Sequence, residues 1–169
     1  MLTASEVADH LIALSEQRGE PFSNSKLQCL LYYSQAWHLA IYDECLFNDD
    51  IEAWPNGPAI ASAHRHLEPL DTSIKPESVL EEAVRDHLQR IVYRYGSRTA
   101  GELERLVQTE SPWIIARQRY PIDQRMIVQE DVMRLSYRYG SQDLVTRGAV
   151  ALCRAWAAII AFGFDTASE

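Results

Sequence analysis

Cysteine is scarce in this chain of 169 residues, and its few copies are not arranged for chemistry. Cys29, Cys45 and Cys153 are odd in number and far apart, which excludes a disulfide framework and the paired spacing of a zinc site. Free thiols are typical of a reducing compartment, so we expect a cytoplasmic protein. We expect Cys29 to be a small core residue. No neighbour in the sequence would lower the pKa of Cys45, so it is a poor nucleophile candidate.

Glycine is also sparse, with seven residues and none in G-x-G order, which excludes a phosphate-cradling glycine loop. The N-terminus lacks a basic region followed by an apolar run, so we expect no signal peptide. The longest apolar run, 149–164, contains Arg154 and is shorter than the ~20 residues that span a bilayer. We expect this run to be a core helix or the seam of a homodimer, and we expect no membrane partner.

Basic residues are fewer than acidic ones, with 16 Lys and Arg against 24 Asp and Glu, and the formal net charge is −8. A negative field repels phosphate, so we expect no direct nucleic-acid partner. The densest basic group, Arg117, Arg119 and Arg125, is diluted by neighbouring acidic residues and does not form the basic face of a DNA-reading helix. The charge is compatible with a basic protein partner and also with a role in solubility alone.

Helical periodicity and capping signals dominate the rest of the chain. Its length suits one domain, and we predict an all-α bundle of about seven or eight helices in which 1–140 form the main unit. The C-terminal helix within 141–169 is expected to pack on the same domain. Capping boxes are predicted at Thr3 and Thr99, and a left-handed helix end at Gly96. The predicted helices cover approximately 3–17, 24–42, 59–67, 78–95, 99–107, 111–119, 131–139 and 141–162. Loops are predicted at 68–77 and 121–129, and one short extended segment is predicted near residues 46–54.

The predicted helix 24–42 is apolar on nearly every face, which is typical of a helix in the middle of a helical fold. Its inward stripe is expected to contain Leu27, Leu30, Leu31, Ser34, Trp37, His38 and Ile41. Polar residues interrupt it at Lys26, Gln28, Ser34 and Gln35. Because a buried polar group without a partner costs about 1–3 kcal/mol, Lys26 and Gln28 either face water at the helix start or tie the helix to the turn at 54–58 or to a bound partner.

The candidates for catalysis and metal binding are weak. His64 and His66 are two residues apart, which points them to different helix faces, unlike the i, i+4 pair of a zinc helix. His38 is expected to be a buried, hydrogen-bonded histidine. The acidic residues of 43–52 could be paired catalytic carboxylates, but we favour the interpretation that they form a solvated loop. We therefore expect no catalytic residue, no metal and no cofactor.

Three ordered motifs resemble those of the Panacea domain, the SocA-like or GepA-like family of phage-associated and antitoxin proteins. The first is Lys-Leu-Gln-x-Leu-Leu-Tyr-Tyr-x-Gln-x-Trp-His-Leu-Ala at 26–40. The second comprises Leu46-Phe47, Ile51 to Trp54 and Gly57-Pro58, and the third is Glu-Ser-Pro-Trp at 110–113. The resemblance covers residues 3 to about 139. Cys29 replaces the second lysine usual in the first motif, and Pro55-Asn56 replaces the more typical Lys-Tyr.

The resemblance implies a mostly helical, non-enzymatic protein-binding module of a toxin–antitoxin system. Family members bind and neutralise varied small toxins, and one delivers its toxin to the ClpXP protease. The implied partners are thus a cognate toxin and a ClpXP-type protease, with neutralisation by occlusion or by proteolytic delivery. Two alternatives stay open: a phage-associated enzyme, and an acidic mimic of nucleic acid. The residues predicted to bind the partner are Lys26, Gln28, Tyr33, Trp37, Trp54, Gly57, Pro58 and Trp113.

Overall fold

The computed structural model describes residues 2–64, 80–118 and 126–140. Over these ranges the chain forms seven helices and one small hairpin, which confirms the predicted all-α class. The expected final helix at 141–162, the apolar run at 149–164 and the whole loop at 68–77 lie outside the described residues. In chain order the elements are α1 (Ala4–Gln17), α2 (Asn24–Tyr42), β1 (Glu52–Trp54), β2 (Gly57–Ala59), α3 (Ala61–His64), α4 (Glu82–Tyr95), α5 (Ala100–Thr109), α6 (Ser111–Gln118) and α7 (Glu130–Tyr139).

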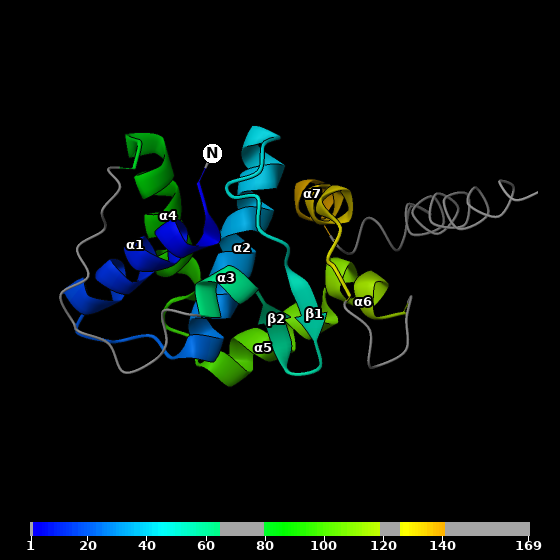
Figure 1. Ribbon diagram of the computed structural model, residues 1–169, viewed down its shortest axis with the longest axis horizontal. Coiled ribbons are helices and arrows are strands. Elements are labelled where there is room, and N and C mark those ends of the chain that lie inside the picture. Colours follow the sequence, from blue (N-terminus) through cyan, green and yellow to red (C-terminus); the bar gives the residue numbers. More distant parts are fainter. Residues whose placement is uncertain (1, 65–79, 119–125, 141–169) are drawn as a thin grey trace, which may run out of the picture.

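Helix α2 forms the centre of the fold, as its all-round hydrophobicity predicted (Figure 1). It packs against α1, α4, α5 and α7, and its first half also contacts β2. Its leucines and two of its tyrosines, Tyr32 and Tyr33, are fully buried in one continuous core. Ile41 is a correction to the predicted stripe, because 55% of it is exposed. It lies in the last turn of α2, just before Asp43 ends the helix in the left-handed conformation with φ 64°.

Local capping signals predicted most helix starts correctly. Thr3 with Glu6 and Thr99 with Glu102 both form complete capping boxes, and Ser23 accepts a hydrogen bond from the Lys26 backbone. Helix α4, in contrast, begins at Glu82 and not at Ser78. Gly96 is also a correction, because its φ of −64° is right-handed. A Cβ there would lie 2.4 Å from the Val92 carbonyl oxygen, so this position needs a glycine for space and not for a positive φ.

The segment after α2 is held in place by one buried side chain, Gln35. Its Oε1 accepts from the backbone N–H groups of Leu46 and Phe47 at 2.9 and 3.2 Å, and its Nε2 donates to the Phe47 carbonyl at 3.0 Å. Gln35 is only 2% exposed. Backbone groups in such a buried, irregular segment need side-chain partners. The single side chain of Gln35 forms hydrogen bonds with three of these backbone groups.

We expect Gln35→Leu to destabilise the protein by about 3 kcal/mol or more, because each buried backbone group left without a partner costs about 1–3 kcal/mol. Urea unfolding followed by circular dichroism measures the change. Gln89→Leu is a matched control, because Gln89 is exposed on α4. A loss below about 1 kcal/mol for Gln35→Leu would show that water replaces the side chain.

The hairpin is more extensive than the predicted extended segment. β1 pairs antiparallel with β2 in the register Glu52 with Ala59, Ala53 with Pro58 and Trp54 with Gly57. Residues 126–128, predicted as loop, lie along the other edge of β1. Ala53 N–H donates to the Met126 carbonyl at 2.6 Å, and Val128 N–H donates to the Ile51 carbonyl at 2.8 Å. Both edges of β1 are therefore paired, which fixes the hairpin between α5, α6 and the start of α7.

Candidate functional site: the hairpin pocket

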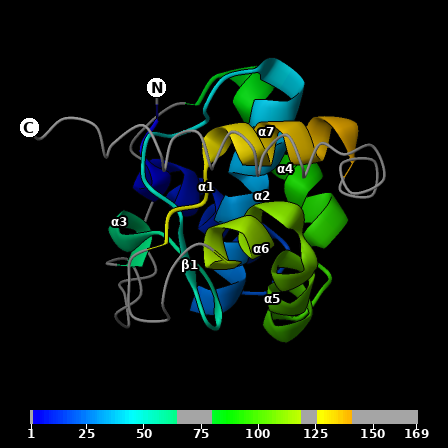
Figure 2. The same cartoon turned by 90° about the vertical axis from the view of Figure 1, so that its right-hand side faces the viewer.

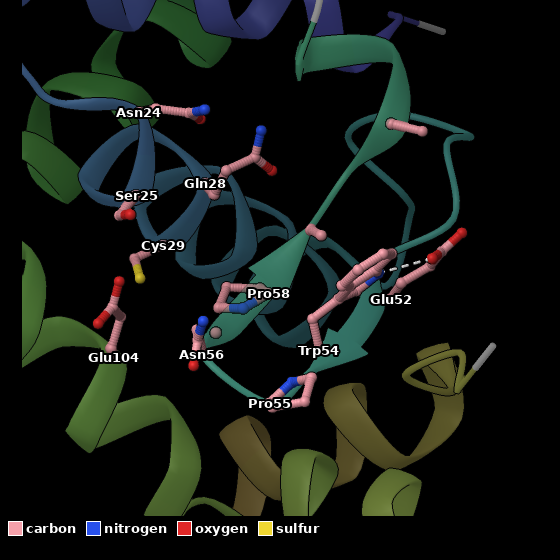
Figure 3. A pocket seen from close by; sticks show the side chains of 13 residues that line it. Asn24, Ser25, Gln28, Cys29, Glu52, Trp54, Pro55, Asn56, Pro58 and Glu104 are labelled. Atoms are coloured by element: carbon pink, nitrogen blue, oxygen red, sulfur yellow. Dashed lines mark hydrogen bonds between the residues drawn. The ribbon is translucent and has the colours of Figure 1, made fainter. Parts of the chain in front are cut away.

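A pocket of about 440 Å³ opens between the start of α2 and the β1–β2 hairpin. We call it the hairpin pocket. Figure 3 shows α2 side chains on one side, the hairpin on the other and Glu104 from α5 between them. Most of its exposed lining is apolar. It is lined by Asn24, Ser25, Gln28, Cys29, Glu52, Trp54, Pro55, Asn56, Gly57, Pro58, Ala59, Ala61 and Glu104.

Gln28 joins α2 to the end of the hairpin. Its Oε1 accepts from the Ile60 backbone N–H at 2.8 Å, and the residue is 3% exposed. Of the two alternatives for Gln28, exposure to water is therefore excluded, and the side chain ties the helix to the segment that follows β2. Its Nε2 is buried and has no hydrogen-bond partner in the described part of the chain. The wall of the pocket thus contains one unused donor.

Trp54 stands at the mouth of the pocket and is 57% exposed. It is the last residue of β1, and its indole Nε1 donates to Glu52 Oε2 at 2.8 Å (Figure 3). The strand pairing fixes its backbone, and the bond to Glu52 restrains its ring. Little rotamer entropy is left to lose on contact with a partner, and such restrained aromatic side chains are the usual anchors of protein interfaces.

Gly57 allows the hairpin to turn beside α5. Its φ of +147° lies where L side chains rarely occur, and an added Cβ would meet Glu104 Cγ at 3.2 Å. The side chain of Glu104 therefore packs against the hairpin turn. With Pro58 buried next to it, this Gly-Pro pair shapes the floor of the pocket and presents little surface of its own.

The thiols near this region are not activated. Burial, together with the negative charges of Glu104 and Glu110, raises the pKa of Cys29 to about 12. Burial also raises the pKa of Cys45 to about 11. Because the thiolate is the nucleophile, both cysteines are inert at neutral pH.

The predicted partner-binding residues fall into two groups. Gln28, Trp54, Gly57 and Pro58 line the hairpin pocket. Lys26 points elsewhere, with its Nζ donating to the Gly96 carbonyl at 2.6 Å and lying over the Phe22 ring. Trp113 belongs to the core and is 5% exposed.

Tyr33 and Trp37 belong to an aromatic layer further along α2. The Tyr33 ring stacks on Tyr95 with centroids 4.0 Å apart, and Trp37 Nε1 donates to the Tyr95 hydroxyl at 2.9 Å. The Arg94 guanidinium lies over Trp37, 4.8 Å from its ring centroid. The two residues therefore brace α2 against α4, and they do not line the pocket.

Glu110, at the junction of α5 and α6, is the centre of a cluster that sequence reasoning missed. Its carboxylate accepts the hydroxyls of Tyr32 at 3.0 Å, Tyr33 at 3.2 Å and Tyr137. We call these four residues the Glu110 cluster. They join α2 and α7 to the α5–α6 junction, and Figure 2 shows α7 crossing in front of α2 above α6. The glutamate of the third motif thus cross-links the elements that carry the hairpin.

Burial raises the pKa of Glu110, although the three hydroxyl bonds oppose the shift. Burial is also the main cause that raises the pKa of Tyr32 and Tyr33, and the negative charge of Glu110 is the second cause. The hydroxyls therefore stay protonated and donate, while the carboxylate accepts.

The other candidate groups have structural partners. Asp43 forms ion pairs with Arg134 at 3.0 Å and Arg138 at 3.3 Å, and Asp49 Oδ2 accepts from the Ala4 backbone N–H at 2.8 Å. His38 is half-buried, with its Nδ1 2.7 Å from the Glu44 carbonyl oxygen. In the described ranges, no three His, Cys, Asp or Glu residues gather as a metal site. Of the predicted pair His64 and His66, His66 lies outside those ranges.

Within the residues that the structure describes, no helix has both the length and the hydrophobicity needed to traverse a bilayer. Comparison with known proteins gives no match among curated proteins or solved structures. The family model described as "Antitoxin SocA-like, Panacea domain" matches residues 27–114. That range runs from α2 through the hairpin to the start of α6, and it contains nearly the whole hairpin pocket and Glu110. The chain belongs to the SocA-like Panacea family of antitoxin domains, as its three motifs predicted.

Proposed function

We propose that the chain is an antitoxin that neutralises a small toxin protein by binding it at the hairpin pocket. Family membership supports an antitoxin-like role in general. The observation that carries the site assignment is Trp54, a 57% exposed tryptophan that is fixed by strand pairing beside an apolar pocket of about 440 Å³. An exposed aromatic anchor next to a pocket that can take a partner side chain is the usual centre of a protein interface.

The surroundings of the pocket support binding over catalysis. The thiol in its wall is inert because of its raised pKa. Glu52 is hydrogen-bonded to the Trp54 indole, so it restrains the aromatic anchor. General acid–base chemistry needs a group within hydrogen-bond reach of a reacting atom, whereas the hydrogen bonds of Glu52 and Gln28 hold the walls of the pocket.

Rigidity is the second support for this assignment. Gln28 fixes the end of the hairpin to α2, residues 126–128 pair with β1, and the Glu110 cluster ties α2 to α7. A preorganised surface binds more tightly because less conformational entropy is lost on association. Helix α2 thus holds the Trp54 corner in place for a partner.

Co-expression with each adjacent open reading frame tests the proposal. We expect one neighbour to arrest growth when expressed alone and to become harmless when this chain is present. A host without ClpXP-type protease separates the two routes, because occlusion keeps the rescue there and proteolytic delivery loses it. A neighbour that is harmless alone, or that stays lethal beside this chain, would contradict the proposal.

A further inference from the structure

The hairpin pocket has apolar walls and an acidic rim. Cys29, Pro58, Ala59 and Ala61 provide apolar surface, and the Trp54 ring stands at the mouth. Among the residues that the structure describes, Glu52 and Glu104 are the charged ones in its lining, and none of these lining residues is a lysine or arginine. A side chain that fits such a space has an aliphatic stem and a cationic end.

The carboxylate of Glu104 is available to a partner. It forms no ion pair or hydrogen bond with any described residue, while its stem packs against Gly57. Its negative charge reaches the pocket, because it is one of the causes that raise the pKa of the neighbouring Cys29 thiol. Figure 3 shows the carboxylate directed toward Cys29.

We propose that the hairpin pocket binds a basic side chain of the toxin, with arginine preferred over lysine, between the Glu104 carboxylate and the Trp54 indole. This inference rests on the proposed function and specifies the chemistry of the partner at that site. The methylene groups lie along Pro58 and the alanines. The guanidinium pairs with Glu104 and stacks on the exposed indole, a cation–π contact that is strongest for tryptophan.

Arginine fits this site better than lysine for two reasons. Its planar guanidinium stacks on an aromatic face and is more weakly hydrated than an ammonium group, so its desolvation costs less. It also donates in a fixed fork that a carboxylate accepts in bidentate form. The net charge of −8 on the chain adds long-range attraction for a basic partner.

The unused Nε2 donor of Gln28 favours a peptide segment as the occupant over a free amine. A main-chain carbonyl next to the basic residue supplies the acceptor that this buried donor lacks, and a small adjustment of the pocket wall brings the two together. The polar groups of the pocket therefore match a peptide that offers one carbonyl and one cation.

The test uses the ¹⁵N-labelled full chain and two capped amino acids, N-acetyl-arginine N-methylamide and its neutral analogue N-acetyl-citrulline N-methylamide. The indole N–H signal of Trp54 is assigned with Trp54→Phe. We expect the arginine compound to shift this signal and the Gly57 amide, and to bind about threefold or more tightly than the citrulline compound. Glu104→Gln should reduce arginine binding to the citrulline level, while Glu16→Gln, an exposed carboxylate on α1, should leave it unchanged.

Equal binding of the two compounds, an unchanged arginine affinity in Glu104→Gln, or shifts confined to other signals would overturn the inference. Co-expression distinguishes this failure from failure of the proposed function. If wild type and Glu104→Gln both neutralise the toxin while arginine selectivity is absent, only the cation site is wrong. If the wild-type chain neutralises no neighbour, the antitoxin assignment itself fails, whatever the capped arginine shows.

Discussion

Trp54→Ala is expected to abolish toxin neutralisation and to leave the fold intact. An interface anchor of this kind contributes about 2 kcal/mol or more, which corresponds to at least about a 30-fold loss of affinity. The side chain is 57% exposed, and the β1 hydrogen bonds of Ala53 and Ile51 do not involve its ring. Calorimetry with the toxin found by co-expression measures the affinity, and thermal unfolding of the free chain shows that the fold is retained.

Tyr93→Ala is the matched control for this prediction. Tyr93 is an aromatic residue that is 86% exposed, and it belongs to α4, a helix that lies away from the hairpin (Figure 1). We expect its removal to change neither affinity nor rescue. If Trp54→Ala binds as tightly as Tyr93→Ala, the hairpin pocket is not the docking surface.

Glu110→Ala is expected to cause a large loss of stability. It removes the acceptor shared by Tyr32, Tyr33 and Tyr137, and each buried hydroxyl left without a partner costs about 1–3 kcal/mol. The sum of about 3 kcal/mol or more is a large share of the 5–15 kcal/mol that is typical of a domain. Urea unfolding measures the change. A loss below about 1 kcal/mol would show that the cluster does not hold α2 and α7 together.

Glu110→Gln separates the charge of this residue from its hydrogen bonds. Because burial raises the pKa of Glu110 above its ordinary value of 4.5, the folded state binds the proton more tightly than the unfolded state. The stability gained from this preference is present at acid pH and is lost as the pH rises from 4.5 through the raised pKa. We therefore expect wild-type stability, measured relative to Glu110→Gln, to fall over that range. A rise would mean that the hydroxyl bonds outweigh burial.

Local signals in the sequence predicted what local physics controls. Both capping boxes, at Thr3 and Thr99, and the extent of α2 could be predicted because an N-cap or an apolar helix face is determined by neighbours within a few residues. The predictions for the start of α4 and for the conformation of Gly96 were wrong. Glycine is required at position 96 because a Cβ there would clash with the Val92 carbonyl oxygen. The usual preference of glycine for a left-handed helix end takes no account of such a contact.

Contacts distant in sequence were beyond prediction from one chain. The pairing of 126–128 with β1 brings together residues more than 70 positions apart, and Tyr137 reaches Glu110 from another helix. Trp54, Gly57 and Pro58 line one pocket because the second motif is itself a hairpin, and Gln28 joins them from α2. Lys26 binds the Gly96 carbonyl instead. Trp113, Tyr33 and Trp37 pack in or against the core, an environment that sequence alone does not distinguish from an interface.

Photo-crosslinking at position 54 tests the central claim most directly. The benzophenone amino acid p-benzoylphenylalanine replaces Trp54 in one version of the chain and Tyr93 in another, and each is irradiated together with the toxin. We predict a covalent complex with the toxin from position 54 and none from position 93. A complex from position 93 with none from position 54 would show that the partner docks elsewhere, and the hairpin pocket would then have no part in neutralisation.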